Sequence, residues 1–373
     1  LIINLFFPTR SDCTMPADFR HARFLLIQMM HHGDVLLNTA VADALKQAWP
    51  DCTIDMLVYQ GMQDVLLDNP AINEVLTVDR AWKKQGPLKH AALEIGLARK
   101  IRAHRYDAVL NFSNRWLAGF VTAASGAPVR LSYLWHNRRN ALWHGLHTQL
   151  IEPAGMDTHT VDDYLNLLAP LALPHTTPSK VRMGISSQSR DSLKQKLAAQ
   201  GWQNEPYILA HPGSRWFFKC WDTEKTAALL QKLLDNGHHI LITAAPDARE
   251  HEMLQQLTST LRPGHTGKLW LLDGVLTLRE LAAAIDGARL FFGVDSVPMH
   301  MAAALGKPQV ALFGPTWVSR WRPYSNQATV VWAGDYGELP HPNSIDVNTS
   351  ERFLSAIPVE AVWQAIEQRL AEK

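Results

Sequence analysis

The segment Phe291–Gly314 reads FFGVDSVPMHMAAALGKPQVALFG. It opens within one apolar run, Leu290–Val294, and closes on a second, Gln309–Phe313, and each run predicts a buried strand. Between them Pro298 opens a short helix and Gly306 ends it, because proline suits the first turn of a helix and glycine the position after its last turn. Two buried strands joined by a helix form a βαβ unit of a parallel sheet.

The Asp295-Ser296 turn before this helix has the features of a phosphate site. The first N–H groups of a helix have no intrahelical partners, and the helix dipole adds partial positive charge there. Such an end binds phosphate readily. With His300 one turn into the helix, we interpret the turn as the leaving-group end of a nucleotide-sugar site. An ordinary βαβ crossover with a capping serine fits the same stretch equally well.

Length and composition indicate a folded protein with room for two domains. The 373 residues are 47% hydrophobic and 19% charged, so the chain can bury large cores and is not disordered. With 36 basic and 35 acidic residues, the net charge is close to zero, and any electrostatic role must be local. Cys13, Cys52 and Cys220 have no metal-ligand spacing and predict reduced thiols in a cytoplasmic protein.

No membrane span or targeting segment is expected from the sequence. No run approaches the roughly 18 apolar residues that a transmembrane helix requires. The opening LIINLFF is soon broken by Pro8 and Arg10, which argues against a signal peptide. Because the first strand is expected to begin near Phe24, we expect residues 1–20 to form an N-terminal extension.

Apolar runs of strand length alternate with segments of helical periodicity in both halves of the chain. The expected strands are 24–30, 53–59, 74–79, 107–112, 129–133, 207–210, 239–244, 268–272, 290–294 and 309–313. The expected helices are 37–48, 62–67, 88–105, 115–124, 160–172, 222–234, 247–261, 277–286 and 299–305. Residues 134–160 and the stretch after Gly314 read as irregular, and an amphipathic helix ends the chain.

This alternation predicts an α/β protein with two doubly wound, Rossmann-like halves. The Pro- and Thr-rich segment LPHTTPSK at 173–180 marks a linker. The expected parts are the 1–20 extension, an N-terminal domain over 21–175, a C-terminal domain over 176–350 and a terminal helix in 351–373. The terminal helix could pack back on the N-terminal domain. Ligands of such folds bind at the carboxyl ends of the strands, in the crevice between domains.

The common nucleotide fingerprints are missing, which counts against a dehydrogenase or a P-loop kinase. There is no GxGxxG, and Gly306-Lys307 is followed by Pro308, so it is not a P-loop. Gly33-Asp34 follows the first expected strand, where a carboxylate can take a proton from an incoming hydroxyl. The alternative is that Asp34 caps the helix that follows.

The segment HPGSRWFFKCW at 211–221 follows an expected strand, as a ligand loop does. Gly213 allows the backbone to approach a ligand closely. Ser214 and Lys219 can supply donors to diphosphate oxygens, with Lys219 as a point charge. A surface loop with solvated cations is the alternative, and the many aromatic residues argue against it. After the next strand, Glu250 can hold ribose hydroxyls or serve as an acid at a helix start.

Four segments, HHGDVLL, HPGSRWFFKCW, LDGVLTLRELAAAI and GVDSVPMHMAAALGKPQVALFGPT, occur in this order within about residues 23–330. Together they resemble the bacterial lipopolysaccharide core heptosyltransferases of glycosyltransferase family 9. The likeness is greatest to the heptosyltransferase III group, which adds the side-branch heptose of the inner core. The resemblance implies a two-domain GT-B fold, ADP-L-glycero-D-manno-heptose as donor, inversion at the anomeric carbon, and no metal or cofactor.

The resemblance also implies roles for individual residues. Asp34 would be the general base. The donor would be bound by Ser214, Lys219, Glu250, Asp295, Ser296, Val297 and His300. Many relatives have Asp-Thr-Gly-Leu where this chain has Asp295-Ser296-Val297-Pro298, so a glycine and one amide donor are absent. The ribose acid stays open between Glu250 and Glu252.

The predicted reaction is the transfer of heptose to a heptose of the lipid A-linked inner-core oligosaccharide. Heptosyltransferase I or II, with a different inner-core acceptor, is the alternative within the same class. A non-catalytic sugar-nucleotide-binding scaffold is the alternative from another class, and the presence of Asp34 and Lys219 argues against it. A nucleic-acid binder is disfavoured because the sequence contains no recognisable binding module.

The stretch from Arg80 to Arg139 is strongly basic, with twelve Lys or Arg residues against two acidic ones. Part of this charge fits the solvated face of a helix. The residues expected to bind the acceptor lie in loops after strands: Lys83, Lys84, Arg115, Arg138 and Arg139. Basic groups are attracted to an anionic lipid surface. We therefore expect the N-terminal half to bind the acceptor at the cytoplasmic face of the inner membrane, as a peripheral protein.

Overall fold

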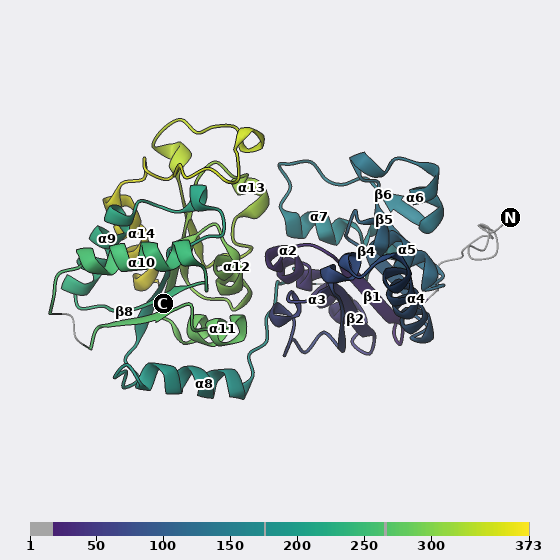
Figure 1. Cartoon of the computed structure of the whole chain (residues 1–373), viewed down its shortest axis with the longest axis horizontal. Coiled ribbons are helices and arrows are strands. Elements are labelled where there is room, and N and C mark those ends of the chain that lie inside the picture. Colours follow the sequence, from purple (N-terminus) through teal and green to yellow (C-terminus); the bar gives the residue numbers. More distant parts are fainter. Residues whose placement is uncertain (1–17, 175–176, 265–266, 373) are drawn as a thin grey trace. The chain divides into compact units, whose positions relative to one another are not determined.

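A computed structural model describes residues 18–174, 177–264 and 267–372 (Figure 1). The chain divides into two compact units, residues 1–184 and residues 185–373. The expected N-terminal extension falls almost entirely on residues outside the described part. Of its last residues, Phe19 is buried and its ring packs on Phe24 and Trp49.

The first unit is a parallel sheet of six strands in the order β3-β2-β1-β4-β5-β6. Its strands are β1 (Arg23–Gln28), β2 (Thr53–Tyr59), β3 (Glu74–Val78), β4 (Ala108–Asn111), β5 (Val129–Tyr133) and β6 (Gln149–Ile151). The α-helices between and after them are α2 (His32–Leu37), α3 (Thr39–Ala48), α4 (Pro87–Ala103), α5 (Trp116–Ala124), α6 (Ala141–Leu146) and α7 (Thr160–Asn166). Residues 24–28 are fully buried because helices cover both faces of the sheet, as in other parallel α/β proteins.

The second unit repeats this plan, with the strand order β12-β11-β10-β7-β8-β9. Its strands are β7 (Tyr207–His211), β8 (His239–Ala244), β9 (Leu269–Asp273), β10 (Leu290–Val294), β11 (Gln309–Phe313) and β12 (Ala328–Trp332). Its α-helices are α8 (Ser187–Ala198), α9 (Thr223–Asp235), α10 (Ala248–Thr260), α11 (Leu278–Gly287), α12 (Val297–Ala304), α13 (Val318–Trp321) and α14 (Val359–Ala371). In Figure 1, α8 lies beside α11 and α10 beside α9.

Both sheets have the strand order 3-2-1-4-5-6 of the Rossmann fold. In each, the chain winds outward in one direction from the first strand and then in the other direction from the fourth. The switch points therefore lie between β1 and β4 and between β7 and β10. Loops at the carboxyl ends of these strands diverge and leave room for a ligand. The predicted doubly wound α/β fold is confirmed.

The α-helices α2, α6, α8 and α13 and the strands β6 and β12 were not predicted. Strand β6 has three residues, too few for an alternating pattern to appear, and it is a strand because it pairs with β5. Strand β12 is short and half-buried at the edge beside β11, in a stretch that reads as a loop. Helix α8 is largely polar and contributes few apolar positions to a periodic pattern.

The boundary between the units lies at Gly184, later than the expected 175. Asp43 accepts a hydrogen bond from the Lys180 N–H at 2.9 Å, and Asn69 Nδ2 donates to the Arg182 carbonyl at 3.1 Å. Gly184 packs on the backbone of Asp68 so closely that a Cβ would lie 1.8 Å from its oxygen. The end of the expected linker is thus bound to the first unit.

The terminal helix α14 packs on α9 and on β10, β11 and β12 of its own unit. The core contacts of this helix thus lie within the second unit. Its apolar face, with Val362 and Ile366 fully buried, belongs to the core cluster of the second sheet. Among the described residues, no helix has the length and apolar content that crossing a bilayer requires.

Candidate functional site

Asp34 lies in the first turn of α2, just beyond the carboxyl end of β1, and is half-buried. Its Oδ2 accepts a hydrogen bond from the His31 N–H at 3.3 Å, and its Oδ1 accepts one from the Tyr164 hydroxyl at 3.2 Å. Burial raises the pKa of the Asp34 carboxyl above its ordinary value, although these hydrogen bonds oppose the rise. A carboxylate with a raised pKa is a better proton acceptor than an ordinary aspartate.

Tyr164 is in turn held by Gln28, the last residue of β1. The Gln28 Nε2 donates to the Tyr164 hydroxyl oxygen at 3.0 Å, and both side chains are buried. Since Tyr164 Oη accepts this bond, its own proton is directed to Asp34. The sequence did not point to either residue, because Tyr164 is 130 positions from Asp34 and its hydroxyl carries no local signal.

At the switch point of the second unit, Lys219 and Asp295 form a buried ion pair. The Lys219 Nζ lies 2.6 Å from Asp295 Oδ2, which also accepts a hydrogen bond from Thr316 Oγ1 at 2.7 Å. Lys219 follows β7 and Asp295 follows β10, so the pair joins the loops of the two central strands. A buried ammonium is not the solvated surface cation of the alternative interpretation.

The start of α12 is built as predicted, but without a capping serine. The Ser296 hydroxyl donates to the Val294 carbonyl at 3.2 Å instead of capping the helix. Val297 opens the helix and is half-buried, Pro298 lies in the first turn, and His300 is buried one turn further on. Ser296 thus occupies the N-cap position without its side chain capping the helix, which corrects that part of the alternative.

Glu250 is buried beneath the loop that follows β7. Its Oε2 accepts a hydrogen bond from the Ala245 N–H at 2.8 Å and lies 4.0 Å from the His211 Nε2. Burial raises the pKa of Glu250 and lowers the pKa of His211 to about 4, so the imidazole is neutral at pH 7. A Cβ on Gly213 would lie 2.3 Å from Glu250 Oε2, so a larger residue there would have to displace this carboxylate. Ser214, the next residue, is buried.

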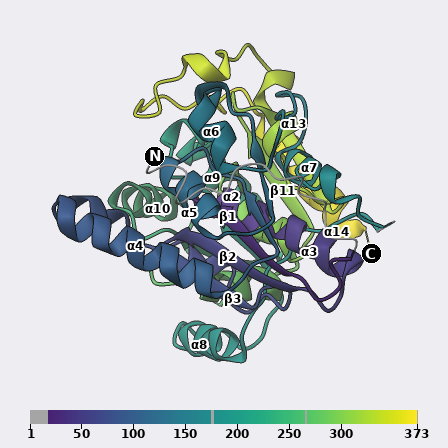
Figure 2. The ribbon, with the colours of Figure 1, turned by 90° about the vertical axis from the view of Figure 1, so that its right-hand side faces the viewer.

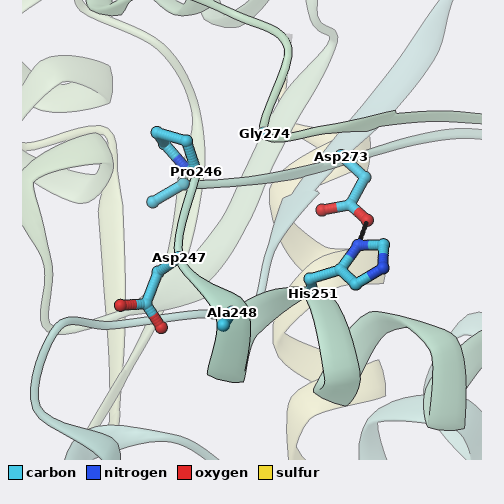
Figure 3. Close-up of a pocket in the computed structure, with 7 residues that line it drawn as sticks. Pro246, Asp247, Ala248, His251, Asp273 and Gly274 are labelled. Atoms are coloured by element: carbon cyan, nitrogen blue, oxygen red, sulfur yellow. Dashed lines mark hydrogen bonds and ion pairs between the residues drawn. The ribbon is translucent and has the colours of Figure 1, made fainter.

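A pocket of about 300 Å³ opens where β8 and β9 end (Figure 3). Its walls are Ala245, Pro246, Asp247, Ala248, His251, Asp273 and Gly274. Asp247 caps α10 by accepting from the Arg249 and Glu250 N–H groups, and the His251 ring is hydrogen-bonded to the Asp273 carboxylate. Glu252 is exposed and does not line the pocket.

The five basic residues expected to bind the acceptor differ in their exposure and in the contacts that they make within the first unit. Lys83, Lys84 and Arg115 are exposed. Arg138 Nε donates to the Asn114 carbonyl at 2.8 Å, and its guanidinium lies 4.7 Å from the ring centre of Trp116. The exposed Arg139 pairs with Glu152 at 2.7 Å. The side chain of Arg138 therefore also stabilises its own loop.

Among the described residues, one group of acidic and imidazole side chains has the spacing of metal ligands, but its oxygens already accept hydrogen bonds from the protein. Asp55, Glu74 and His104 bring ligand atoms within 4.8 Å of one another. The Asp55 carboxylate already accepts hydrogen bonds from Tyr106, from the Asn73 side chain and from the Glu74 N–H. Asp55 and Glu74 lie at the amino ends of β2 and β3, away from the ligand edge. We assign this group a structural role.

Comparison with known proteins places the chain in a family. Residues 95–349 match the family described as "Glycosyltransferase family 9 (heptosyltransferase)". Lipopolysaccharide heptosyltransferase 3 of Escherichia coli is 33% identical over 342 residues, which cover 92% of this chain and 97% of that protein.

Two solved structures share the fold. A family 9 glycosyltransferase from Veillonella parvula DSM 2008 has a TM-score of 0.82 at 23% identity and covers 96% of this chain and 100% of its own. The E. coli heptosyltransferase WaaC with ADP has a TM-score of 0.70 at 21% identity, with coverages of 93% and 99%. The resemblance seen in the sequence is thereby confirmed: the chain belongs to glycosyltransferase family 9, the heptosyltransferase family, and is a glycosyltransferase of the GT-B class.

Proposed function

We propose that this glycosyltransferase transfers heptose, with inversion, from ADP-L-glycero-D-manno-heptose to a heptose of the lipopolysaccharide inner core. The observation that carries the proposal is the 33% identity to a lipopolysaccharide heptosyltransferase 3 along 92% of the chain. The solved E. coli relative WaaC is described with ADP and with an ADP-2-deoxy-2-fluoro heptose, which supports an ADP-sugar as donor here.

In this proposal the donor diphosphate lies at the switch point of the second unit. The first turn of α12 offers the Ser296 and Val297 N–H groups and the positive end of its dipole. Lys219 has three protons and gives one to Asp295, so the others can reach a diphosphate oxygen. Ser214 and His300 complete the proposed contacts. These groups stabilise the negative charge that develops on the departing diphosphate.

We place the nucleoside of the donor in the pocket at the ends of β8 and β9. Glu250 remains our proposed ribose residue. Its Oε2 is held by the Ala245 N–H, which leaves Oε1 as the oxygen that a ribose hydroxyl would meet. Neither glutamate lines this pocket. Glu250 is the better choice because its carboxylate is held by the Ala245 N–H beside the pocket and lies against Gly213, whereas the Glu252 side chain is exposed.

Asp34 acts as the general base in the proposed reaction. The acceptor hydroxyl gives its proton to Asp34 while its oxygen forms a bond to the anomeric carbon. The bond from that carbon to the diphosphate oxygen breaks, and its electron pair leaves with ADP. Because attack and departure occur on opposite sides of the carbon, the configuration inverts. Asp34 belongs to the first unit and the donor residues to the second, so both units must contribute to one reaction.

We further propose that Lys83, Lys84, Arg115, Arg138 and Arg139 bind or steer the acceptor. The inner-core acceptor is attached to lipid A in an anionic membrane. Exposed cations near such a surface attract it, and salt screens the attraction within about 10 Å. The proposal places the protein in the cytoplasm, as a peripheral protein on the cytoplasmic face of the inner membrane.

The function is tested by supplying the purified protein with ADP-heptose and defined core oligosaccharides. Mass spectrometry should show one added heptose on a core that already holds the two main-chain heptoses, and ADP should be released. Addition only to a core lacking one of these heptoses would instead identify a heptosyltransferase I or II. Binding of ADP-heptose without any transfer would identify a non-catalytic scaffold and refute the proposal.

Replacing Tyr164 with phenylalanine should shift the acid limb of the pH–rate profile to higher pH. The hydroxyl donates to the charged form of Asp34 and lowers its pKa, so the loss of the hydroxyl raises the pKa of the base further. The ring contact with Phe112 is retained. Tyr133→Phe is the matched control, because Tyr133 donates to the Asp163 carbonyl and not to Asp34. An unshifted profile for Tyr164→Phe would show that this bond does not tune the base.

A further inference from the structure

Helix α4 lies on the outside of the first unit (Figure 2). Four of its exposed residues are apolar and form a stripe along the helix. Leu88 is 87% exposed and Ile95 is 51% exposed. Ala91 and Ala92 are exposed as well. The spacing of these four residues, at intervals of three and four, places them on one face of the helix.

This stripe is separate from the face by which α4 packs on its sheet. Leu97 and Ile101 are buried in the core cluster around β1 and β4. The helix is therefore apolar on two sides: one side packs in the core, and the other is exposed to solvent. Isolated exposed apolar residues are ordinary, but a continuous helical stripe next to a ring of charge marks an interaction site.

Four cations surround the stripe: Lys83, Lys84, Lys89 and Arg99 are all exposed. Lys83 and Lys84 belong to the 3₁₀ helix η2 (Arg80–Lys84), which packs against α4. Within the described chain, none of the four forms an ion pair, whereas the acidic Glu94 of the same helix is paired with His90 at 3.0 Å. With four cations and the single carboxylate of Glu94, the surroundings of the stripe are net positive.

An apolar helical face flanked by unpaired cations has the chemistry of a helix that lies in the plane of an anionic bilayer. The apolar side chains enter the acyl boundary and the cations stay among the headgroups. We infer that the outward face of α4, with Leu88, Ile95, Lys83, Lys84 and Lys89, is a docking surface for an anionic lipid bilayer. The inference rests on the proposed function for its biological purpose, since the proposed acceptor is attached to a lipid.

The test is sedimentation of the full-length protein with vesicles of phosphatidylcholine alone or mixed with phosphatidylglycerol. The wild type should bind the mixed vesicles more tightly, and added salt should weaken the binding. Lys83→Gln with Lys84→Gln and Lys89→Gln should reduce that affinity about fivefold per cation. Leu88→Gln with Ile95→Gln should reduce it about tenfold or more, also at high salt. Glutamine retains helix propensity, so α4 should stay folded.

Val347→Gln is the matched control, because Val347 is 48% exposed but belongs to the second unit. Its vesicle affinity should equal that of the wild type. Wild-type affinity of the Leu88/Ile95 variant would overturn the inference. A dimer that this variant abolishes, without any vesicle binding by the wild type, would assign the face to protein association and also overturn it.

A second readout separates this inference from the proposed function. With a soluble core oligosaccharide freed of lipid, the Leu88/Ile95 variant should transfer heptose at the wild-type rate, since neither residue is assigned to donor or acceptor. If the wild type shows no transfer yet binds anionic vesicles through α4, the proposed function fails and the docking surface stands. If transfer is normal and vesicle binding is absent, the docking surface fails alone.

Discussion

Replacing Asp34 with asparagine should lower kcat about 10²–10⁴-fold, because the proposed reaction loses its general base. The change keeps the size of the side chain and one oxygen that can accept the His31 N–H, so helix α2 should persist. The assay is heptose transfer at saturating ADP-heptose and acceptor, with ADP affinity measured separately by calorimetry. ADP affinity should be unchanged, since the donor residues lie in the second unit.

The direction in which Asp34→Asn changes the free energy of unfolding can also be predicted. The folded-state pKa of Asp34 is raised, so the folded protein holds this proton more tightly than the unfolded chain does. The free energy of unfolding therefore falls as pH rises from the ordinary pKa of an aspartate in the unfolded chain through the raised pKa in the folded protein. The loss persists at neutral pH. Asparagine removes that loss. Unfolding at pH 7 should show equal or slightly greater stability, with a change of at most about 1 kcal/mol.

A matched control is Asp64→Asn in the neighbouring 3₁₀ helix η1 (Gln63–Val65). Asp64 is also a half-buried acid in the first turn of its helix, but nothing places it in the reaction. This variant should transfer heptose at the wild-type rate. Near-normal turnover by Asp34→Asn would mean that another residue takes the proton, and the mechanism would have to be abandoned.

Replacing Lys219 with methionine should destabilise the second unit and abolish tight donor binding. Removing one partner of a buried ion pair typically costs about 3–5 kcal/mol, because the other charge stays buried without compensation. We expect a value near the lower end, about 3 kcal/mol, since Thr316 still donates to Asp295. Urea unfolding measures the loss, and calorimetry measures ADP affinity.

The double variant Lys219→Met with Asp295→Asn separates the two effects. It no longer has a buried carboxylate, so much of the lost stability should return. ADP affinity should stay low, because the cation for the diphosphate is still absent. Should Lys219→Met unfold at the same urea concentration as the wild type, the ion pair contributes no stability. Should the double variant bind ADP normally, Lys219 is not a donor residue.

The elements nearest the switch points were predictable because their signals are local. The segment from β10 to β11 has two apolar runs, a proline in the first helical turn and a glycine after the last, and each of these acts within a few residues. Strands β2, β5 and β8 also have the expected bounds. Strand β6 and helix α8 depend on pairing and packing with distant residues, which a local pattern does not contain.

The same distinction applies to the candidate site. Asp34 and Lys219 follow expected strands, so their position at the ligand edge could be inferred from the sequence. Their partners could not. Tyr164 reaches Asp34 across 130 positions, and Asp295 meets Lys219 across 76, through contacts that only the folded sheet creates. The prediction of Lys219 as a diphosphate contact did not foresee that a carboxylate already holds its ammonium.

The separation of the two units at Gly184 has an evolutionary consequence. In our proposal, acceptor recognition is encoded upstream of this residue and donor recognition downstream of it. Mutations that change which sugar chain is extended can therefore accumulate in one half of the gene without disturbing use of the shared activated sugar. A lineage of enzymes can thus diversify its products while drawing on a single precursor pool.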